Sequence, residues 1–260
     1  MMSSNERCLS SNQCIGSDNL SNVFVTARQL ITLPGSHLLA WTCLFNIDEF
    51  NNNQFNFILK GSSVSVRAVA KRKAEHVAGR LCIHWCYQMW VNQTPPLIYS
   101  DKHGCPIWPV PFKGSISHCN GKAVGVLTLD PHIQSLGLDI ETLLDDKTTA
   151  DIVSMVLSSE ELSLYASAYK EKMLFSCYVT LIFSAKEAIY KALYPIVKHM
   201  FDFSAASVVA VSNTNIRFIL HSHALPELVD MTPIDVSYRI EDNSVLCACV
   251  IENSFNRYVR

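Results

Sequence analysis

The sequence has no run of about 18 consecutive apolar residues, so it contains no segment suited to span a membrane. Residues 1–22 are rich in Ser and Asn and lack the apolar core of a signal peptide, which predicts a polar, disordered N-terminus. Charged residues amount to only 17% of the chain, and the formal net charge is −2. Because proteins that bind nucleic acids usually carry a basic excess, we expect no nucleic-acid partner.

Two metal-site patterns and one hydrolase pattern are also missing. The ten cysteines include no CxxC pair, and the nine histidines include no HExxH motif. We therefore interpret the cysteines as reduced core residues of a cytoplasmic protein. No GxSxG turn is present either, which argues against a hydrolase with a serine nucleophile and His118 as its base.

What the sequence does contain is ample material for a core. Apolar residues make up 49% of the 260 residues, enough for one large domain or two small ones. Helical and strand-like patterns are mixed without a regular βαβ rhythm, which predicts an α+β fold. Helices are expected over 66–90, over 145–168 and through 183–193 to an end near Pro195. Strands are expected at 37–47, 115–117, 123–129, 136–141, 206–220, 234–240 and 244–251, and the proline-rich segment 94–114 is expected to be an ordered loop.

The pentapeptide GLDIE, residues 137–141, brings two carboxylates together. On a strand, alternation places Asp139 and Glu141 on one face. Adjacent carboxylates repel each other, and a hard cation such as Mg²⁺ between them relieves that repulsion. Taken alone, the pentapeptide fits better with a half-buried strand whose polar face meets water.

The segment FSAKEAIYKAL, residues 183–193, is a mostly apolar helix with three charges. Glu187 and Lys191 share one face of it, which alone predicts a weak surface ion pair. The apolar residues around them, however, leave little room for a wide polar face. Lys186, Glu187 and Lys191 would suit a metal-bridged diphosphate, with the acid as ligand or base.

The segment VRAVAKRKAEHVAGR, residues 66–80, carries five basic residues against the single acid Glu75. Arg72 and Arg80 can each bind a phosphate of one ligand through a planar guanidinium, although the segment taken alone fits better with a solvated basic face. Gly79 inside the helix costs about 1 kcal/mol relative to Ala, which predicts a close packing contact there.

The segment DKHGCPIWPVPFKGSISHCNG, residues 101–121, leads from a proline-rich loop into a strand. Ser115 and Ser117 are expected on one strand face, and His118 on the other or at the strand end. Hydroxyls and an imidazole at a strand terminus suit a phosphate.

Together and in this order, KRKAEHVAGR, WPVPFKGSISHC, GLDIE and FSAKEAIYKAL resemble the motifs of the 4′-phosphopantetheinyl transferase superfamily, in particular its siderophore and surfactin type and within that the enterobactin type. The matching pieces run from residue 71 to 193. The resemblance implies two similar α+β halves related by a pseudo-two-fold, joined near Gly137, with the active site at their interface. The halves are expected at 23–135, with the coenzyme A nucleotide contacts, and at 136–260, with the metal-binding acids.

The resemblance also implies Mg²⁺ as cofactor, coenzyme A as co-substrate and a serine of an apo carrier protein as acceptor. Carried over by position, the metal ligands are Asp139, Glu141 and Glu187, and Glu187 is also the base. Lys186 and Lys191 match basic residues near the diphosphate. The coenzyme A contacts carried over are Arg72, Arg80, Ser117 and His118, with His118 near the 3′-phosphate. Relatives often have a lysine where His103 stands, so either His103 or Lys102 is expected to meet the nucleotide.

Several alternatives stay open at this point. The carrier is expected to belong to siderophore synthesis, but a polyketide, polyunsaturated fatty-acid or primary fatty-acid synthase would use the same chemistry. A non-catalytic module that binds carriers or nucleotides, and an Mg²⁺-dependent phosphohydrolase, are the rival classes. A monomer suffices for a two-halved fold, with or without association with a synthetase complex.

Overall fold

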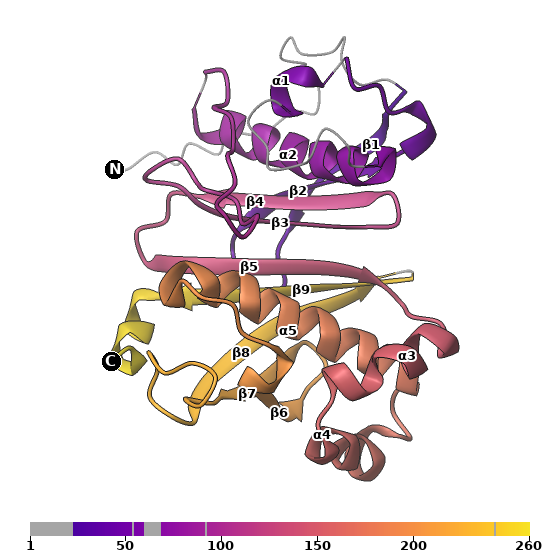
Figure 1. Ribbon diagram of the computed structural model, residues 1–260, viewed down its shortest axis with the longest axis vertical. Coiled ribbons are helices and arrows are strands. Elements are labelled where there is room, and N and C mark those ends of the chain that lie inside the picture. Colours follow the sequence, from indigo (N-terminus) through magenta and orange to yellow (C-terminus); the bar gives the residue numbers. More distant parts are fainter. Residues whose placement is uncertain (1–22, 54, 60–68, 92, 242) are drawn as a thin grey trace, which may run out of the picture.

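The computed structural model describes residues 23–53, 55–59, 69–91, 93–241 and 243–260. It forms two α+β halves, each with one antiparallel sheet and one long helix, which confirms the expected fold class. Figure 1 shows the halves one above the other, with β3 and β4 of the first facing β5 and β9 of the second. The N-terminal segment 1–22, expected to be disordered, and residues 66–68 of the first expected helix lie outside the described residues.

The first half contains a four-stranded sheet in the order β1-β2-β4-β3. Its helix α2 packs against β2, β3 and β4 and buries apolar residues such as Val77 and Cys82. A Cβ at Gly79 would lie 2.5 Å from Cγ2 of Ile116, so the glycine allows α2 to approach β3, as the sequence predicted. The bounds are β1 Val25–Thr32, β2 Leu39–Phe45, α1 Asn56–Leu59, α2 Ala70–Trp90, β3 Lys113–Cys119 and β4 Lys122–Thr128, with a short 3₁₀ turn at Ile47–Glu49.

The second half contains a five-stranded sheet in the order β5-β9-β8-β7-β6, and the apolar helix α5 packs across β5 and β9. The bounds are β5 Ile133–Thr142, α3 Asp146–Val156, α4 Ser159–Leu164, a π-helical turn at Tyr165–Tyr169, α5 Phe175–Val197, β6 Ala206–Val211, β7 Asn215–Leu220, β8 Thr232–Glu241 and β9 Ser244–Glu252, with 3₁₀ turns at Phe203–Ala205 and Asn253–Tyr258. Since β5 begins at Ile133, the change from the first sheet to the second precedes the boundary expected at 135–136.

The two halves repeat one motif. In the first, β2 leads through α2 to the hairpin β3–β4, and β4 lies between β2 and β3. In the second, β5 leads through α5 to β8 and β9, and β9 lies between β5 and β8. All of these neighbours are antiparallel. This shared order is consistent with the pseudo-two-fold that the resemblance implied.

The halves meet through an apolar layer between the sheets, with Val124 and Val126 on one side and Leu138 and Leu246 on the other. At one edge of this layer, the Ser115 hydroxyl accepts a hydrogen bond of 2.9 Å from the backbone N–H of Leu138. β3 and β5 therefore lie side by side and hold residues of the two halves in contact.

Several expected elements have other bounds in the structure. The strand expected over 206–220 is two strands, β6 and β7, with residues 212–214 between them. The helix expected over 145–168 divides into α3 and α4 at Leu157, where the chain turns extended before Ser158 caps α4. The last helix continues past Pro195 to Val197, because a proline close to a helix C-terminus removes only one bond while the buried Val197 keeps packing. Strand β1 was not expected. Six of its eight residues, 26–30 and 32, are exposed, so the strand has no buried face that would give an apolar alternation.

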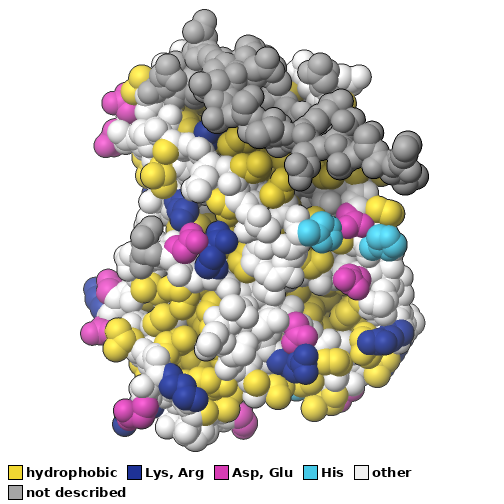
Figure 2. Space-filling model, turned by 180° about the vertical axis from the view of Figure 1, so that it is seen from behind, with side chains coloured by type: hydrophobic (Ala, Val, Ile, Leu, Met, Phe, Trp, Pro, Cys, Tyr) yellow, Lys and Arg dark blue, Asp and Glu magenta, His cyan; other side chains and the backbone are white. Residues whose placement is uncertain are grey.

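The surface carries no dominant field of one sign on the face that Figure 2 shows. Among the side chains drawn in colour there, basic and acidic groups are interspersed between apolar patches. No helix in the described part of the chain is both long and apolar enough to cross a membrane.

Candidate functional site

One cavity of about 640 Å³ lies where the two halves meet. Helix α2, the proline-rich loop and β3 of the first half form one side of it, and β5 and α5 of the second half form the other. All four sequence segments that the motifs singled out therefore contribute to a single site.

The acidic wall of this cavity comes from β5 and α5. Asp139 and Glu141 line the cavity together from alternate positions of β5, as the strand pattern predicted. Glu187 reaches the same cavity because α5 lies directly on β5 at Gly137, where an added Cβ would be only 2.0 Å from the carbonyl oxygen of Ala188. Glycine at this position thus allows the acid of the helix to lie near the acids of the strand.

Burial, together with crowding, disfavours the charged forms of Glu141 and Glu187. Burial, followed by repulsion from Asp139, raises the pKa of Glu141 to about 8, and Glu187 adds to the repulsion. Burial also raises the pKa of Glu187, with a further contribution from Asp139, while Lys191 opposes the shift. Without a cation the protein therefore disfavours full ionisation of this cluster, and a bound cation would favour the charged carboxylates.

Asp139 is the most constrained of the three acids. Its Oδ1 accepts hydrogen bonds from Lys191 Nζ at 2.6 Å and from the Ser117 hydroxyl at 2.7 Å. Lys191 Nζ also donates to the Ser117 oxygen at 3.1 Å. The buried Oδ2 of Asp139 has no hydrogen-bond partner among the described residues. A buried carboxylate oxygen without a partner is costly, and a metal ion would satisfy it.

Asp139, Glu141 and Glu187 are the donor set available for the Mg²⁺ that the resemblance implied. Three carboxylates and one unpartnered oxygen fit a hard divalent cation by their chemistry. As they stand, however, the described side chains contain no group of three or more His, Cys, Asp or Glu residues arranged to hold a metal ion. The Lys191 ammonium instead occupies Oδ1 of Asp139.

The basic wall of the cavity comes from α2. Arg80 is buried, and its guanidinium donates to the hydroxyl of Ser100 at 3.2 Å and to the carbonyl oxygen of Ile98 at 3.4 Å. It also lies 3.1 Å from Nδ1 of His76, whose pKa falls to about 3 through burial and the charge of Arg80. Arg80 thus holds the loop against α2. Arg72, in contrast, is exposed and lines the cavity, so its guanidinium is accessible to a ligand.

His118 lies on the face of β3 opposite to Ser117 and points toward α2. Its Nδ1 is 3.8 Å from Oε2 of Glu75, a buried acid that also lines the cavity. Burial, then the charges of Arg72 and Lys191, lower the pKa of His118 to about 4. Sequence reasoning gave Glu75 no role, although a lone acid among five basic residues was the available signal.

The proline-rich loop is fixed to the end of α5. Asp101 accepts a hydrogen bond of 2.6 Å from the Tyr194 hydroxyl and caps its own turn by accepting from the backbone N–H groups of His103 and Cys105. The ring of His103 packs edge-on against Tyr194. Of the two candidates for the nucleotide contact, His103 lines the cavity and Lys102 does not.

The structure places Lys186 elsewhere, in disagreement with its expected position near the diphosphate. Its Nζ donates to Oε2 of Glu161 and to the carbonyl oxygen of Val156, both at 2.8 Å, and its side chain is only 4% exposed. Lys186 and Glu161 are absent from the cavity lining. The physical reason is the helix itself, because positions 186 and 191 point about 140° apart around its axis.

Two family models match this chain. The model of the 4′-phosphopantetheinyl transferase N-terminal domain matches residues 63–128, and that of the 4′-phosphopantetheinyl transferase superfamily matches residues 135–249. Enterobactin synthase component D of Salmonella typhimurium (strain LT2) is 33% identical over 181 residues, which cover 68% of this chain and 70% of that protein. The same-named protein of Salmonella austin is 35% identical over 156 residues, 60% of each chain.

Two further similarities are weaker. The 4′-phosphopantetheinyl transferase PptT of Mycobacterium tuberculosis is 28% identical over 145 residues, 55% of this chain and 60% of that protein. The solved structure of a holo-ACP-synthase from Plasmodium yoelii matches with a TM-score of 0.35 and 18% identity, over 46% of this chain and 95% of that chain. The chain spans 60 to 70% of the length of the three curated relatives named.

Proposed function

The chain belongs to the 4′-phosphopantetheinyl transferase superfamily, and we propose that it transfers the 4′-phosphopantetheine group of coenzyme A to a serine of an apo carrier protein. The products would be the holo carrier and adenosine 3′,5′-bisphosphate. The observation that carries this proposal is the single cavity in which Asp139, Glu141 and Glu187 face the basic side around Arg72 and His118. Family membership confirms the resemblance read from the motifs.

The charge distribution of the cavity supports coenzyme A as the donor. A diphosphate would lie on the side of β5 and α5, near a shared cation and Lys191, and the nucleotide phosphate would lie on the side of α2 and β3, near Arg72 and His118. Ser117, Arg80 and His103 line the same cavity. Arg80 and Ser117 already bind protein groups, so their expected role includes holding Ser100 and Asp139 in place.

Asp139, Glu141 and Glu187 would hold the Mg²⁺ ion. When bound, the metal would neutralise the diphosphate oxygens and stabilise the leaving bisphosphate. Glu187 would accept the proton of the carrier serine, and its raised pKa makes the carboxylate a better base near neutral pH. Lys191, close to Asp139, would stabilise the charge that develops during transfer.

The test is a mass measurement on carrier proteins incubated with the enzyme, coenzyme A and Mg²⁺. We expect a gain of one phosphopantetheine group, and a Glu187→Gln variant is expected to lose about 10²- to 10⁴-fold in turnover. Glu171→Gln, at an exposed acid that does not line the cavity, is the matched control. No gain with any carrier of a broad panel would exclude the proposed transfer, and near-normal turnover of Glu187→Gln would place the base elsewhere.

The two rival classes differ in what they do with coenzyme A alone. A phosphohydrolase using the same acids would release adenosine 3′,5′-bisphosphate without an acceptor. A non-catalytic module would bind coenzyme A tightly and leave it intact. We expect release only when an apo carrier is present, which chromatography of the nucleotide products measures directly.

We propose a siderophore-synthesis carrier as the acceptor, because the relatives named above are enterobactin synthase components. A panel that includes polyketide and polyunsaturated fatty-acid carriers tests this choice through relative kcat/KM. A cytoplasmic location is supported by the free thiols of the described cysteines, among them Cys43 and Cys247. A monomer would suffice, since both sides of the cavity come from one chain.

A further inference from the structure

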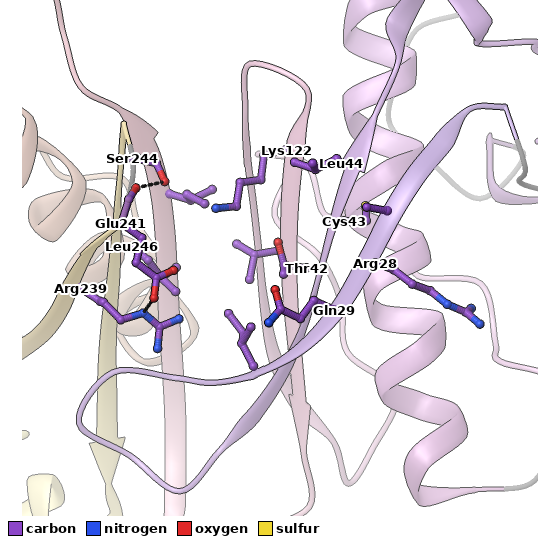
Figure 3. Close-up of a pocket in the computed structure, with 14 residues that line it drawn as sticks. Arg28, Gln29, Thr42, Cys43, Leu44, Lys122, Arg239, Glu241, Ser244 and Leu246 are labelled. Atoms are coloured by element: carbon purple, nitrogen blue, oxygen red, sulfur yellow. Dashed lines mark hydrogen bonds and ion pairs between the residues drawn. The ribbon is translucent and has the colours of Figure 1, made fainter. Parts of the chain in front are cut away.

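A second cavity of about 430 Å³, called the rear cavity here, lies between the same two halves but shares no lining residue with the first. Strands β1, β2 and β4 line it from the first half, and β5, β8 and β9 line it from the second (Figure 3). The alternation of β5 separates the two sites: Ile140 lines the rear cavity, while Asp139 and Glu141 on either side of it line the first.

The floor of the rear cavity is apolar. It is formed by side chains from four strands, all of them partly or fully buried: Ile31, Val124, Ile140 and Leu246. Thr42 also lines the cavity, but its hydroxyl donates to the carbonyl oxygen of Ala123 at 2.9 Å and so is already satisfied as a donor. The floor therefore offers a surface for an apolar group rather than a set of hydrogen bonds.

The rim of the rear cavity is polar, and its charges are unequal. Arg239 and Glu241 form an ion pair with Nε and Oε1 at 2.6 Å, and Glu241 is therefore neutralised from its own strand. Arg28 lies over the rings of Trp41 and Trp85, and Figure 3 shows its guanidinium directed away from the cavity.

Lys122 is the cation that remains. Figure 3 shows its side chain extending from β4 across the gap toward the second half, and Gln29 points its amide into the same space. Among the described residues, no carboxylate lies within ion-pair distance of Lys122; the ion pairs of basic side chains with Asp or Glu join other groups. Lys122 is half-buried as a residue, and its ammonium has no ion-pair partner among the described residues, so beside the apolar floor it is suited to an anion.

We propose that the rear cavity binds a small amphipathic anion, with an apolar body on the floor and a single carboxylate- or sulfonate-type head at Lys122. The volume lies within the range of small-molecule sites. Both halves contribute lining residues, and ligand sites occur preferentially at such interfaces between structural units. This site does not depend on the function proposed for the first cavity, since the two share no residue.

The test uses two fluorescent probes with nearly the same apolar body. Anilinonaphthalene sulfonate carries one anionic head, and N-phenyl-1-naphthylamine carries none. Both are titrated onto the full-length protein with saturating coenzyme A present, so that probe bound in the first cavity is displaced. We expect the anionic probe to bind at one site and the neutral probe to bind more weakly.

Two variants locate that binding. Lys122→Gln keeps the length of the side chain and is expected to weaken the anionic probe at least about tenfold, while the neutral probe is unchanged. Gln29→Glu places a carboxylate of the same size at the exposed rim and is also expected to weaken only the anionic probe. Lys147→Gln, at an exposed lysine outside the cavity, is the control and should change neither.

Three results would overturn the proposal. Complete displacement of the anionic probe by coenzyme A would assign it to the first cavity. Unchanged affinity in both Lys122→Gln and Gln29→Glu would place the probe elsewhere on the surface. Equal weakening of both probes by Lys122→Gln would show that the ammonium contributes no charge recognition.

Discussion

Helix α5 carries two lysine–carboxylate pairs that differ in what surrounds them. Lys186 pairs with Glu161 at 2.8 Å, and the two side chains are 4% and 1% exposed. Lys191 pairs with Asp139 at 2.6 Å, and their side chains are 27% and 4% exposed. The first pair lies under α3 and α4, and the second lines the cavity between the halves.

The difference lies in how completely each carboxylate is bonded. Both oxygens of Glu161 accept backbone N–H groups, Oε2 from Ser158 at 2.9 Å and Oε1 from Val208 at 2.8 Å. Oδ2 of Asp139, in contrast, has no partner among the described residues, and Glu141 and Glu187 repel the same group. A saturated pair stabilises one structure, whereas an unsaturated one is ready to exchange partners with a cation or substrate.

The largest effect is expected from breaking the saturated pair. Lys186→Met would leave the buried Glu161 charge unpaired and is expected to lower the free energy of unfolding by about 3 to 5 kcal/mol. Because the ammonium does not reach the cavity, the KM for coenzyme A should stay within about threefold of normal below the melting temperature. Chemical denaturation and steady-state kinetics measure the two quantities.

This variant decides between two roles of Lys186. The sequence motif placed Lys186 near the diphosphate. If that position were right, Lys186→Met would raise the KM for coenzyme A at least about tenfold with little loss of stability. The exposed Lys147→Met serves as control for removing a positive charge from the same half and should leave both quantities unchanged.

Local geometry explains which parts of the site could be predicted. The shared face of Asp139 and Glu141 follows from strand alternation, and that of Glu187 and Lys191 follows from helix periodicity; the structure has both. The same periodicity separates Lys186 from Lys191 by about 140° around the helix axis. The sequence therefore already indicated that the two lysines do not both face a single diphosphate.

Non-local packing explains the rest. Glu161 meets Lys186 only because α4 folds back under α5, and the pattern SSEEL indicates a helix start without indicating its partner. The continuation of α5 past Pro195 depends on burial of Val197, and the rear cavity depends on six strands from two sheets. Such contacts join residues far apart in the chain, so no local period carries them.

A smaller effect is expected from breaking the unsaturated pair. Lys191→Met should lower kcat about 100-fold, because it removes the ammonium that contacts Asp139 and that is proposed to stabilise the charge developing during transfer. The cost in stability should be only about 1 kcal/mol, since the partly exposed site lets water reach Asp139. An unchanged kcat would show that Lys191 is, like Lys186, a structural lysine.

Lys191→Met also reports on the metal without any activity assay. Removing the ammonium frees Oδ1 of Asp139 and leaves the three carboxylates without a counter-charge. Mg²⁺ should therefore raise the melting temperature of this variant more than that of the wild type. Equal shifts in the two proteins would argue that the carboxylates do not hold the metal together.

The smallest expected effect is a pH dependence of the free energy of unfolding that arises from Glu141 in the acidic cluster. The pKa of Glu141 is about 8 in the folded protein against 4.5 as its ordinary value, so the folded state holds a proton that the unfolded state has lost. Its stabilising contribution is complete below about pH 4.5 and is lost as the pH rises through about 8. The slope is at most about 1.4 kcal/mol per pH unit, and partial exposure reduces the total to about 1 to 2 kcal/mol.

Chemical denaturation from pH 5 to 9 in the presence of a chelator, for wild type and Glu141→Gln, measures this difference. Subtracting one protein from the other removes the opposite pH response of His76 and His118, whose lowered pKa values are common to both. Saturating Mg²⁺ should reduce the pH dependence of the difference between the two proteins. A bound cation stabilises the ionised carboxylate of Glu141 and so offsets the loss of its proton as the pH rises. Parallel curves in the chelator would mean that the neighbours of Glu141 do not raise its pKa. The contrast between the saturated pair at Lys186 and the unsaturated pair at Lys191 would then depend on the unpartnered oxygen of Asp139 alone.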